Sequence, residues 1–346
     1  MILDLAIAAV MLGLLVVLVA GLLAPFESLG WWAGWSGPDD MRAGAPSRFR
    51  ESFDPAAVQP DARVVVLFGI NDASETLRHT HEEQFVADLA AALPGCRVIA
   101  DLFPYSAFGV PLNGDRVLAR FWAAVATPSG RLTGLLNLMI NLRNFLQVLT
   151  SADHRYGPFY NFGLAQVIVD AMLRDGYDPA RPRPLVLVGY SGGGQLAIAA
   201  SGMVHETLGV PVHVVSIGGF LASVPGIDGV ARLTHIHGSR DSLQALGRIV
   251  FPERWPAMPH SHWNRAEREG RIRMVAMEGV QHAGPGGYFG REAHMPDGRT
   301  HMATTVDLTA KAVRAAISQP EPCLMPQPKT PVLERLEEAL TRRAGR

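Results

Sequence analysis

The chain has 346 residues, of which 48% are hydrophobic, so it is long and apolar enough to bury one large domain. Its 31 Lys and Arg residues balance 32 Asp and Glu residues, which gives a formal net charge of −1 at pH 7. This balance argues against nucleic acid or another acidic polymer as the main partner.

The first predicted element is an uninterrupted apolar segment at residues 5–24. About 20 apolar residues in a helix match the hydrocarbon core of a bilayer. Three tryptophans follow within residues 31–35, as expected for aromatic side chains at the level of the lipid headgroups. We therefore predict that residues 1–24 hold an uncleaved, single-pass membrane anchor, and we leave open on which side of the membrane the rest of the chain lies. A cleaved signal peptide is the alternative, although Asp4 replaces the usual basic region.

A linker and then a regular alternation of strands and helices follow the apolar segment. Residues 25–60 are rich in Gly, Pro and Ser and predict the linker. Alternation over residues 61–318 predicts an α/β fold with a doubly wound, mostly parallel sheet and helices on both faces. The expected strands are residues 64–68, 97–100, 185–188, 212–217, 233–237 and 272–277, and the expected helices are 81–93, 159–174, 195–208 and 304–317.

Three segments depart from this alternation. An insertion at about residues 105–157 contains an apolar helix at 132–146, which is either a lid over a hydrophobic site or an ordinary buried helix. Residues 242–270 hold aromatic and histidine side chains among prolines and predict an irregular loop. The tail at 319–346 is Pro-rich and ends in a predicted short helix.

Ser191 lies in a Gly-x-Ser-x-Gly motif, residues 189–193, directly after the expected strand at 185–188. A strand, this tight turn and a helix form the context in which a serine becomes a nucleophile. The glycines are needed because a Cβ atom there would clash with the neighbouring strand and helix. Backbone N–H groups at the start of the helix favour negative charge beside the serine oxygen. An ordinary strand-to-helix turn is the alternative interpretation.

A nucleophilic serine needs a base and a carboxylate that orients the base. In a doubly wound sheet these partners follow later strands, in the chain order serine, acid, histidine. Asp241 lies just beyond the strand at 233–237, and His282 lies just beyond the strand at 272–277. Both are therefore expected at the same sheet edge as Ser191. Asp241 is also a favoured residue type for capping the helix that follows it.

Other residues remain alternatives for these roles. Asp228 is the second candidate for the acid, and His294 and His301 are further candidates for the histidine. Histidine and acidic side chains also gather at residues 79–83, and two histidines lie at 260–262, but we expect solvated groups there and no metal site. No phosphate-binding loop follows a strand, so the sequence predicts no nucleotide cofactor.

The motifs around Ser191, Asp241 and His282 resemble the α/β-hydrolase superfamily. They are Gly-Tyr-Ser-Gly-Gly, His-Gly-Ser-Arg-Asp and a histidine in the loop after the last strand. The resemblance implies that Ser191 is the nucleophile, His282 the general base and then acid, and Asp241 its orienting carboxylate. It also implies an oxyanion hole made by the backbone N–H groups of Gly192 and Ile70. The loop around Ile70 lacks the His-Gly-Gly-Gly sequence of one esterase and lipase branch.

The sequence therefore predicts a membrane-anchored serine hydrolase that cleaves an ester or thioester through an acyl-enzyme on Ser191. The apolar segment 5–24 and the apolar helix 132–146 favour a hydrophobic, lipid-like acyl substrate. A peptidase or an acyltransferase with the same three residues stays open, because this fold hosts many reactions. The alternatives are a non-catalytic, membrane-tethered binding domain and, with a cleaved signal peptide, a secreted esterase.

Overall fold

The computed structural model describes residues 59–70, 80–102, 104–105 and 133–318, together with Met11, Leu15 and Val19. Six strands within these residues form one fully parallel sheet in the order β2-β1-β3-β4-β5-β6. They are β1 (Ala62–Leu67), β2 (Cys96–Ile99), β3 (Leu185–Tyr190), β4 (Val212–Ile217), β5 (Val230–Gly238) and β6 (Ile272–Met277). The predicted parallel α/β architecture is confirmed.

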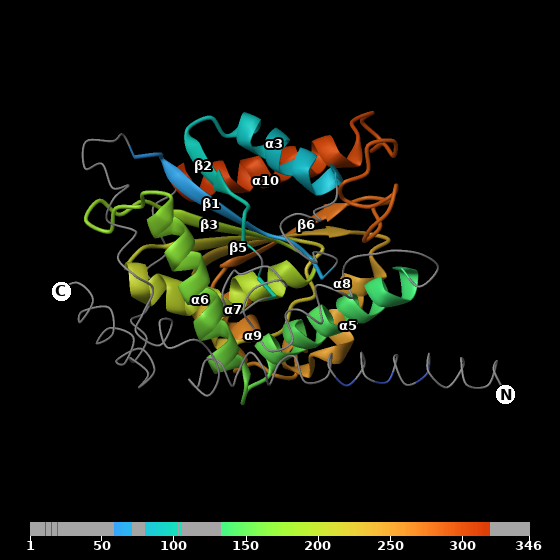
Figure 1. The fold of residues 1–346 in the computed structure, drawn as a ribbon, viewed down its shortest axis with the longest axis horizontal. Helices are drawn as coiled ribbons and strands as arrows, with labels where there is room; N and C mark the ends of the chain where they lie inside the picture. The colour runs from blue at the N-terminus through green and yellow to red at the C-terminus, as the bar shows by residue number, and fades with distance from the viewer. Residues whose placement is uncertain are drawn as a thin grey trace.

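Seven α-helices lie in the described part of the chain. They are α3 (Thr80–Ala92), α5 (Thr133–Ala152), α6 (Gly157–Arg174), α7 (Gly192–Leu208), α8 (Ser242–Val250), α9 (His262–Arg268) and α10 (His301–Ser318). Figure 1 shows α3 and α10 on one face of the sheet and α6, α7 and α9 on the other. Helices therefore cover both faces, as the alternation of elements predicts.

The central strands are mainly apolar because both faces of the sheet are covered. Every residue of β1 and β3 is buried. Side chains alternate between the faces of a strand, so Val64 and Val66 pack in the core under α3 and α10, whereas Val65 and Leu67 pack in the core under α6 and α7. The two cores hold the sheet between two helical layers.

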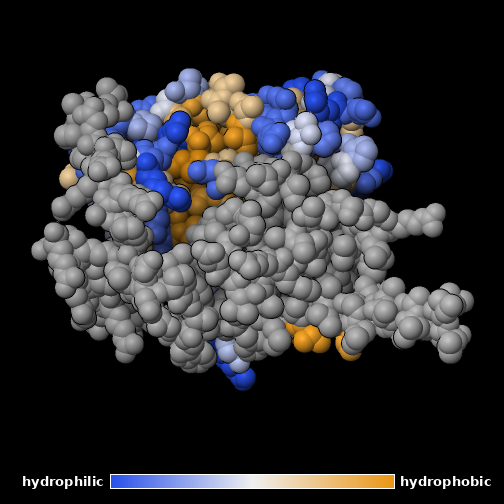
Figure 2. Space-filling view, in the orientation of Figure 1, coloured by the Kyte–Doolittle hydropathy of each residue, from blue (hydrophilic) through white to orange (hydrophobic). Residues whose placement is uncertain are grey.

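The outer strands of the sheet are less well covered. β2 is one edge, and its residues Cys96 and Val98 are only partly buried. Figure 2 shows hydrophobic side chains in a hollow beside β2 and α3, with hydrophilic side chains on either side. β6 forms the other edge and is also largely exposed.

The carboxyl ends of the strands are level with one another at one edge of the sheet. Tyr190 at the end of β3 pairs with Ile217 of β4, which pairs in turn with Ile236 of β5. Gly238 at the end of β5 pairs with Met277 at the end of β6. Residues that follow β3, β5 and β6 in the sequence therefore meet at this edge.

The prediction of an irregular loop at residues 242–270 is wrong, because this segment contains α8 and α9. The Asp241 carboxylate accepts hydrogen bonds from two backbone N–H groups in the first turn of α8. The Ser261 hydroxyl caps α9 in the same way, at 3.1 Å from the Asn264 nitrogen. Three prolines between residues 252 and 259 separate the two helices, which are too short for a clear helical period in the sequence.

The apolar helix expected at residues 132–146 extends further and forms α5. It packs against α6 and α7. Its buried residues follow a helical stripe that comprises Ile140, Arg143, Asn144, Gln147, Val148 and Ser151. Among the described residues, α5 is therefore a packed helix with one buried face. Residues 106–132 of the expected insertion lie outside the described residues.

Most of the predicted membrane anchor also lies outside the described residues. Of residues 5–24, only Met11, Leu15 and Val19 are described, and all three are helical and exposed. Within the described residues, no helix combines the length and the apolar character needed to cross a bilayer. Residues 25–58 and the tail at 319–346 are not among the described residues either, so the linker and tail stay predictions.

Candidate active site

Ser191 occupies a strained turn between β3 and α7. Its backbone has φ 54° and ψ −123°, and it is the one non-glycine residue with a positive φ in the described part of the chain. Its N–H group donates to the carbonyl oxygen of Ile217 on the neighbouring strand at 2.9 Å. Such strain persists only where the surroundings fix the backbone, and it is typical of functional turns.

The glycines beside Ser191 allow strand, turn and helix to pack closely. A Cβ atom at Gly189 would collide with the backbone of Gly193 and Gly194 in the first turn of α7. A Cβ atom at Gly193 would collide with the carbonyl oxygen of Leu67 in β1. These are the clashes with helix and strand that the sequence predicts for side chains at the two positions.

The structure brings Ser191, Asp241 and His282 into one hydrogen-bonded chain. His282 Nε2 lies 2.8 Å from Ser191 Oγ, and His282 Nδ1 lies 2.9 Å from Asp241 Oδ2. The Asp241 side chain is fully buried, whereas the His282 side chain is 20% exposed. An imidazole between a hydroxyl and a buried carboxylate has the geometry needed to remove a proton from that hydroxyl.

Asp241 both caps a helix and orients the histidine, two roles that the sequence poses as alternatives. Its Oδ1 atom accepts hydrogen bonds from the N–H groups of Leu243 at 3.0 Å and Gln244 at 3.1 Å, and its Oδ2 atom faces His282. Burial raises the pKa of Asp241, but hydrogen bonds from His282, Tyr288 and Gln244 and the charge of His282 outweigh it. The pKa therefore lies below its usual value, so the carboxylate is ionised at neutral pH.

Tyr288 is a buried partner of Asp241 that the sequence analysis missed. Its hydroxyl donates to Asp241 Oδ2 at 2.7 Å and accepts from the N–H group of Gly238 at 2.7 Å. Burial and the charge of Asp241 raise the pKa of Tyr288, so the hydroxyl keeps its proton and remains a donor. Nothing in the local sequence marks this tyrosine, because its contact with Asp241 joins residues 47 positions apart.

Tyr190, the residue just before the serine in the Gly-x-Ser-x-Gly motif, contacts the loop that carries His282. Its ring stacks on the His282 imidazole with centroids 5.5 Å apart and an interplanar angle of 20°. Its hydroxyl donates to the backbone carbonyl oxygen of His282 at 2.7 Å. The motif residue therefore fixes both the ring and the backbone of the histidine, a role that the Gly-x-Ser-x-Gly pattern alone does not indicate.

The loop after β1 lies against the serine turn. A Cβ atom built on Gly69 would be 3.1 Å from Ser191 Cβ, and one built on Gly192 would be 3.2 Å from Ile70 Cγ2. Asn144 of α5 donates to the carbonyl oxygen of Ile70 at 2.7 Å and so holds this loop in place. Gly192 and Ile70 are therefore neighbours beside Ser191, and their oxyanion role stays a prediction.

A cleft of about 700 Å³ opens beside His282. Its walls come from Tyr190, from the glycine-rich segment at 283–292 and from His81 and Glu82 at the start of α3. Cavities of this size hold small organic molecules. His282, which would protonate a departing alcohol, thiol or amine, is one of the residues that line the cleft, whereas Ser191 is not.

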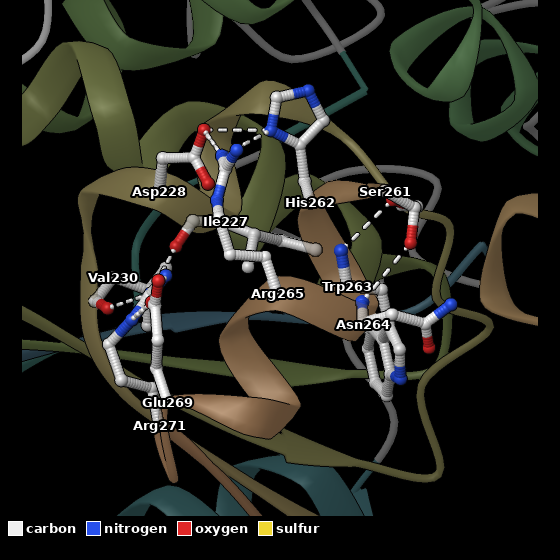
Figure 3. Close-up of polar contacts among 11 residues, drawn as sticks. Ile227, Asp228, Val230, Ser261, His262, Trp263, Asn264, Arg265, Glu269 and Arg271 are labelled. Atoms are coloured by element: carbon white, nitrogen blue, oxygen red, sulfur yellow. Dashed lines mark hydrogen bonds and ion pairs between the residues drawn. The ribbon is translucent and has the colours of Figure 1, made fainter. Parts of the chain in front are cut away.

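The alternative acid, Asp228, lies in a different polar cluster (Figure 3). Its Oδ2 atom accepts from His262 Nδ1 at 2.7 Å and pairs with the Arg265 guanidinium. Burial raises the pKa of Asp228, but its hydrogen bonds with His262 and Arg265 lower it below the usual value. This cluster ties α9 to the turn before β5 and leaves Asp241 as the carboxylate at His282.

The alternative histidines are also engaged elsewhere. His301 is buried, with Nδ1 3.2 Å from the carbonyl oxygens of Gly286 and Gly287. His294 is exposed and forms a short backbone bridge with Thr300. Within the described residues, no three His, Cys, Asp or Glu side chains gather as a possible metal site. His79, which belongs to the predicted solvated cluster at 79–83, lies outside them.

Comparison with known proteins gives only distant structural likenesses. No family model and no curated protein matches the chain. A solved acetylxylan esterase is 13% identical with a TM-score of 0.31, over 75% of this chain and 100% of its own. An uncharacterized protein from Pseudomonas aeruginosa is 12% identical with a TM-score of 0.34, over 94% of this chain and 53% of its own. At these TM-scores neither likeness bears on the activity of this chain.

Proposed function

We propose that this chain is a serine hydrolase of the α/β-hydrolase superfamily that cleaves an ester or thioester. The observation that carries the proposal is the hydrogen-bonded chain from Ser191 through His282 to the buried Asp241. It starts on a strained turn at the carboxyl edge of a parallel sheet, where catalytic groups of such sheets gather. The membrane anchor expected at residues 5–24 belongs to the same proposal.

In the proposed reaction, Ser191 Oγ attacks the carbonyl carbon of the substrate while His282 Nε2 takes the hydroxyl proton. Asp241 stabilises the imidazolium, and the N–H groups of Gly192 and Ile70 stabilise the negative oxygen of the tetrahedral intermediate. His282 then gives its proton to the leaving group, and an acyl-enzyme on Ser191 remains. Water, deprotonated by His282, attacks the acyl-enzyme and releases the carboxylic acid and the free serine.

Two observations support a substrate with an apolar acyl group and a larger leaving group. Val148 of α5 and Ile70 place methyl groups next to Gly192, together with the Tyr105 hydroxyl, which donates to the carbonyl oxygen of Phe68. The cleft of about 700 Å³ is lined in part by His282, the residue that would protonate the leaving group. We propose that the acyl chain lies along α5 and that the leaving group occupies the cleft.

Labelling with a fluorophosphonate probe tests the activated serine. We expect the full-length protein to be labelled and the Ser191→Ala and His282→Ala variants to lose labelling. Ser201→Ala is the matched control, because Ser201 is a buried serine of α7 whose hydroxyl donates to Ala197 within the helix. Hydrolysis by Ser191→Ala should fall by up to ~10⁶-fold.

Labelling of Ser191→Ala at the wild-type level would reject the assignment of the nucleophile. A folded wild-type protein that takes up no probe would instead favour the non-catalytic binding domain. A screen of p-nitrophenyl esters with increasing acyl length then tests the apolar acyl site, which predicts a preference for chains longer than acetyl.

A further inference from the structure

Residues 68–70, which we name the β1 loop, carry the N–H group of Ile70, the second donor of the proposed oxyanion hole. The pairing of β1 with β3 ends at Leu67 and Gly189, so the sheet does not fix the loop. A Cβ atom on Gly69 would be 3.1 Å from Ser191 Cβ, and its absence lets the backbone pass close to the nucleophile. Glycine also gives the backbone more rotational freedom. Contacts from outside the loop must therefore fix the Ile70 N–H group.

Two buried side chains bind the carbonyl groups on either side of this N–H group. The peptide group that carries it links Gly69 to Ile70. In the preceding peptide group, the carbonyl oxygen of Phe68 accepts from the Tyr105 hydroxyl at 2.9 Å. In the following one, the carbonyl oxygen of Ile70 accepts from Asn144 Nδ2 at 2.7 Å. Fixed peptide groups on both sides leave the middle one little freedom, so these two side chains set the direction of the N–H group.

Arg143 determines which way the Asn144 amide points. Its guanidinium donates from Nη1 to Asn144 Oδ1 at 2.9 Å, and a guanidinium has no acceptor atom. The amide oxygen of Asn144 must therefore face Arg143, and the NH₂ group must face the carbonyl oxygen of Ile70. Arg143 and Asn144 are both buried, so this arrangement is shielded from water.

Tyr160 of α6 ties the segment that carries Tyr105 to the same two helices. Its hydroxyl shares a proton between the carbonyl oxygen of Pro104 at 3.1 Å and Gln147 Oε1 at 3.0 Å. Gln147 belongs to α5, as Asn144 does. Helices α5 and α6 pack against each other, and α5 also packs against α7, which starts at the serine turn. The side chains that hold the β1 loop therefore belong to one packed framework.

We propose that Asn144 and Tyr105 are positioning residues that hold the Ile70 N–H group where it can donate to the oxyanion. Donors of an oxyanion hole are effective because they are fixed before the negative charge develops. In this role neither side chain needs to touch the substrate. The inference rests on the proposed function and deepens it, since it names the groups that position one of the two oxyanion donors.

Two variants release the β1 loop in different ways. Asn144→Asp keeps the shape of the side chain and forms an ion pair with Arg143, which supports folding. It also places an acceptor oxygen against the carbonyl oxygen of Ile70, so this hydrogen bond is lost. Tyr105→Phe removes the hydrogen bond to Phe68 and adds no charge.

Asn161→Asp is the matched control for a general loosening of α5. Asn161 is a buried residue of α6, and its Nδ2 donates to the carbonyl oxygen of Ser151 in α5 at 3.0 Å. The change also puts a carboxylate against a carbonyl oxygen, but it does so between the two helices and not at the β1 loop. It therefore separates a weaker contact between α5 and α6 from a displaced Ile70 N–H group.

An inhibitor that becomes an oxyanion on the enzyme measures the proposed role. A trifluoromethyl ketone is the probe, because Ser191 Oγ bonds to its carbonyl carbon, His282 takes the serine proton and the carbonyl oxygen becomes negative. The corresponding alcohol has nearly the same shape but forms no oxyanion. Inhibition constants for both compounds and kcat for a p-nitrophenyl ester are measured for each variant, and urea denaturation shows that each is folded.

We expect Asn144→Asp to lower kcat and to weaken inhibition by the ketone, each by ~10²-fold, and Tyr105→Phe to do so by about tenfold. Inhibition by the alcohol should stay unchanged. The midpoint of the pH dependence of kcat/KM should also stay unchanged, because His282 and Asp241 keep their contacts. Asn161→Asp should lower the free energy of unfolding but leave both inhibition constants unchanged.

Equal weakening of the ketone and the alcohol would overturn the inference, because it would indicate a general distortion of the site. Wild-type inhibition by the ketone in a folded Asn144→Asp protein would also overturn it; if that variant does not fold, the same result in Tyr105→Phe would do so. A wild-type protein that takes up no fluorophosphonate and resists the ketone would refute the proposed hydrolase together with this inference. A labelled wild-type protein whose variants match it would refute this inference alone.

Discussion

Removal of one hydroxyl, in Tyr288→Phe, tests the support of the candidate site. The hydroxyl donates to Asp241 Oδ2, the same oxygen that faces His282 Nδ1, and accepts from the N–H group of Gly238. Phenylalanine keeps the ring and its packing but loses both hydrogen bonds. The change therefore isolates the contribution of the hydroxyl.

The expected magnitude follows from these two bonds, each 2.7 Å long. A hydrogen bond to a charged group contributes about 1.5–3 kcal/mol, and a buried N–H without a partner costs about 1–3 kcal/mol. The free energy of unfolding should therefore fall by about 2.5–6 kcal/mol. If a less well oriented Asp241 raises the activation free energy by about 1.4 kcal/mol, kcat should fall about tenfold.

Urea denaturation at pH 7 and hydrolysis of a soluble p-nitrophenyl ester measure the two effects. Tyr177→Phe is the matched control, because Tyr177 is also buried but packs under Arg63. Arg63 lies at the start of β1, at the amino ends of the strands and away from the candidate site. It should leave kcat unchanged. A Tyr288→Phe protein with wild-type stability and wild-type kcat would refute the positioning role of the hydroxyl.

Three further predictions concern the acid, the serine turn and a buried histidine. Asp241→Asn should lower kcat by ~10⁴-fold while the cap of α8 survives, since asparagine also caps helices; Asp228→Asn, at the other carboxylate, should leave kcat unchanged. Gly193→Ala should destabilise the protein by about 3 kcal/mol or more in urea denaturation, whereas Gly202→Ala on the same helix, where the nearest atom to a Cβ would be 3.4 Å away, should not. Burial lowers the pKa of His213 to about 4. The contribution of neutral His213 to the free energy of unfolding is therefore complete above pH ~6.5 and is lost as the pH falls toward 4. Between pH 7 and pH 5, the free energy of unfolding should fall by about 2 kcal/mol less in His213→Leu than in the wild-type protein. An unchanged pH dependence would contradict this explanation.

Local patterns allowed much of the fold to be predicted from the sequence. Short segments rich in apolar residues marked the strands, because a strand covered on both faces is mainly apolar. The run at 185–188 and the glycines at 189–193 also located the strand-turn-helix around Ser191, since steric limits on a tight turn act between neighbouring residues. Parallel order placed Asp241 and His282 at the correct edge.

The short helices α8 and α9 were missed because their formation depends on context. Each has fewer than ten residues, too few for a helical period to emerge among prolines. Their N-caps and their packing on the body of the domain stabilise them. A capping aspartate or serine is a common residue in loops as well, so the sequence does not separate the two cases.

The sequence by itself determined the order of strands and helices, the strained serine turn and the residue types at the strand ends. The sequence favoured Asp241 over Asp228, but only the tertiary structure showed that Asp241 meets His282, whereas Asp228 pairs with His262 and Arg265. The tertiary structure also revealed Tyr190 and Tyr288, whose contacts with His282 and Asp241 span 92 and 47 residues. Hydrogen bonds over such separations depend on how strands and loops assemble, and no local pattern of residues encodes them.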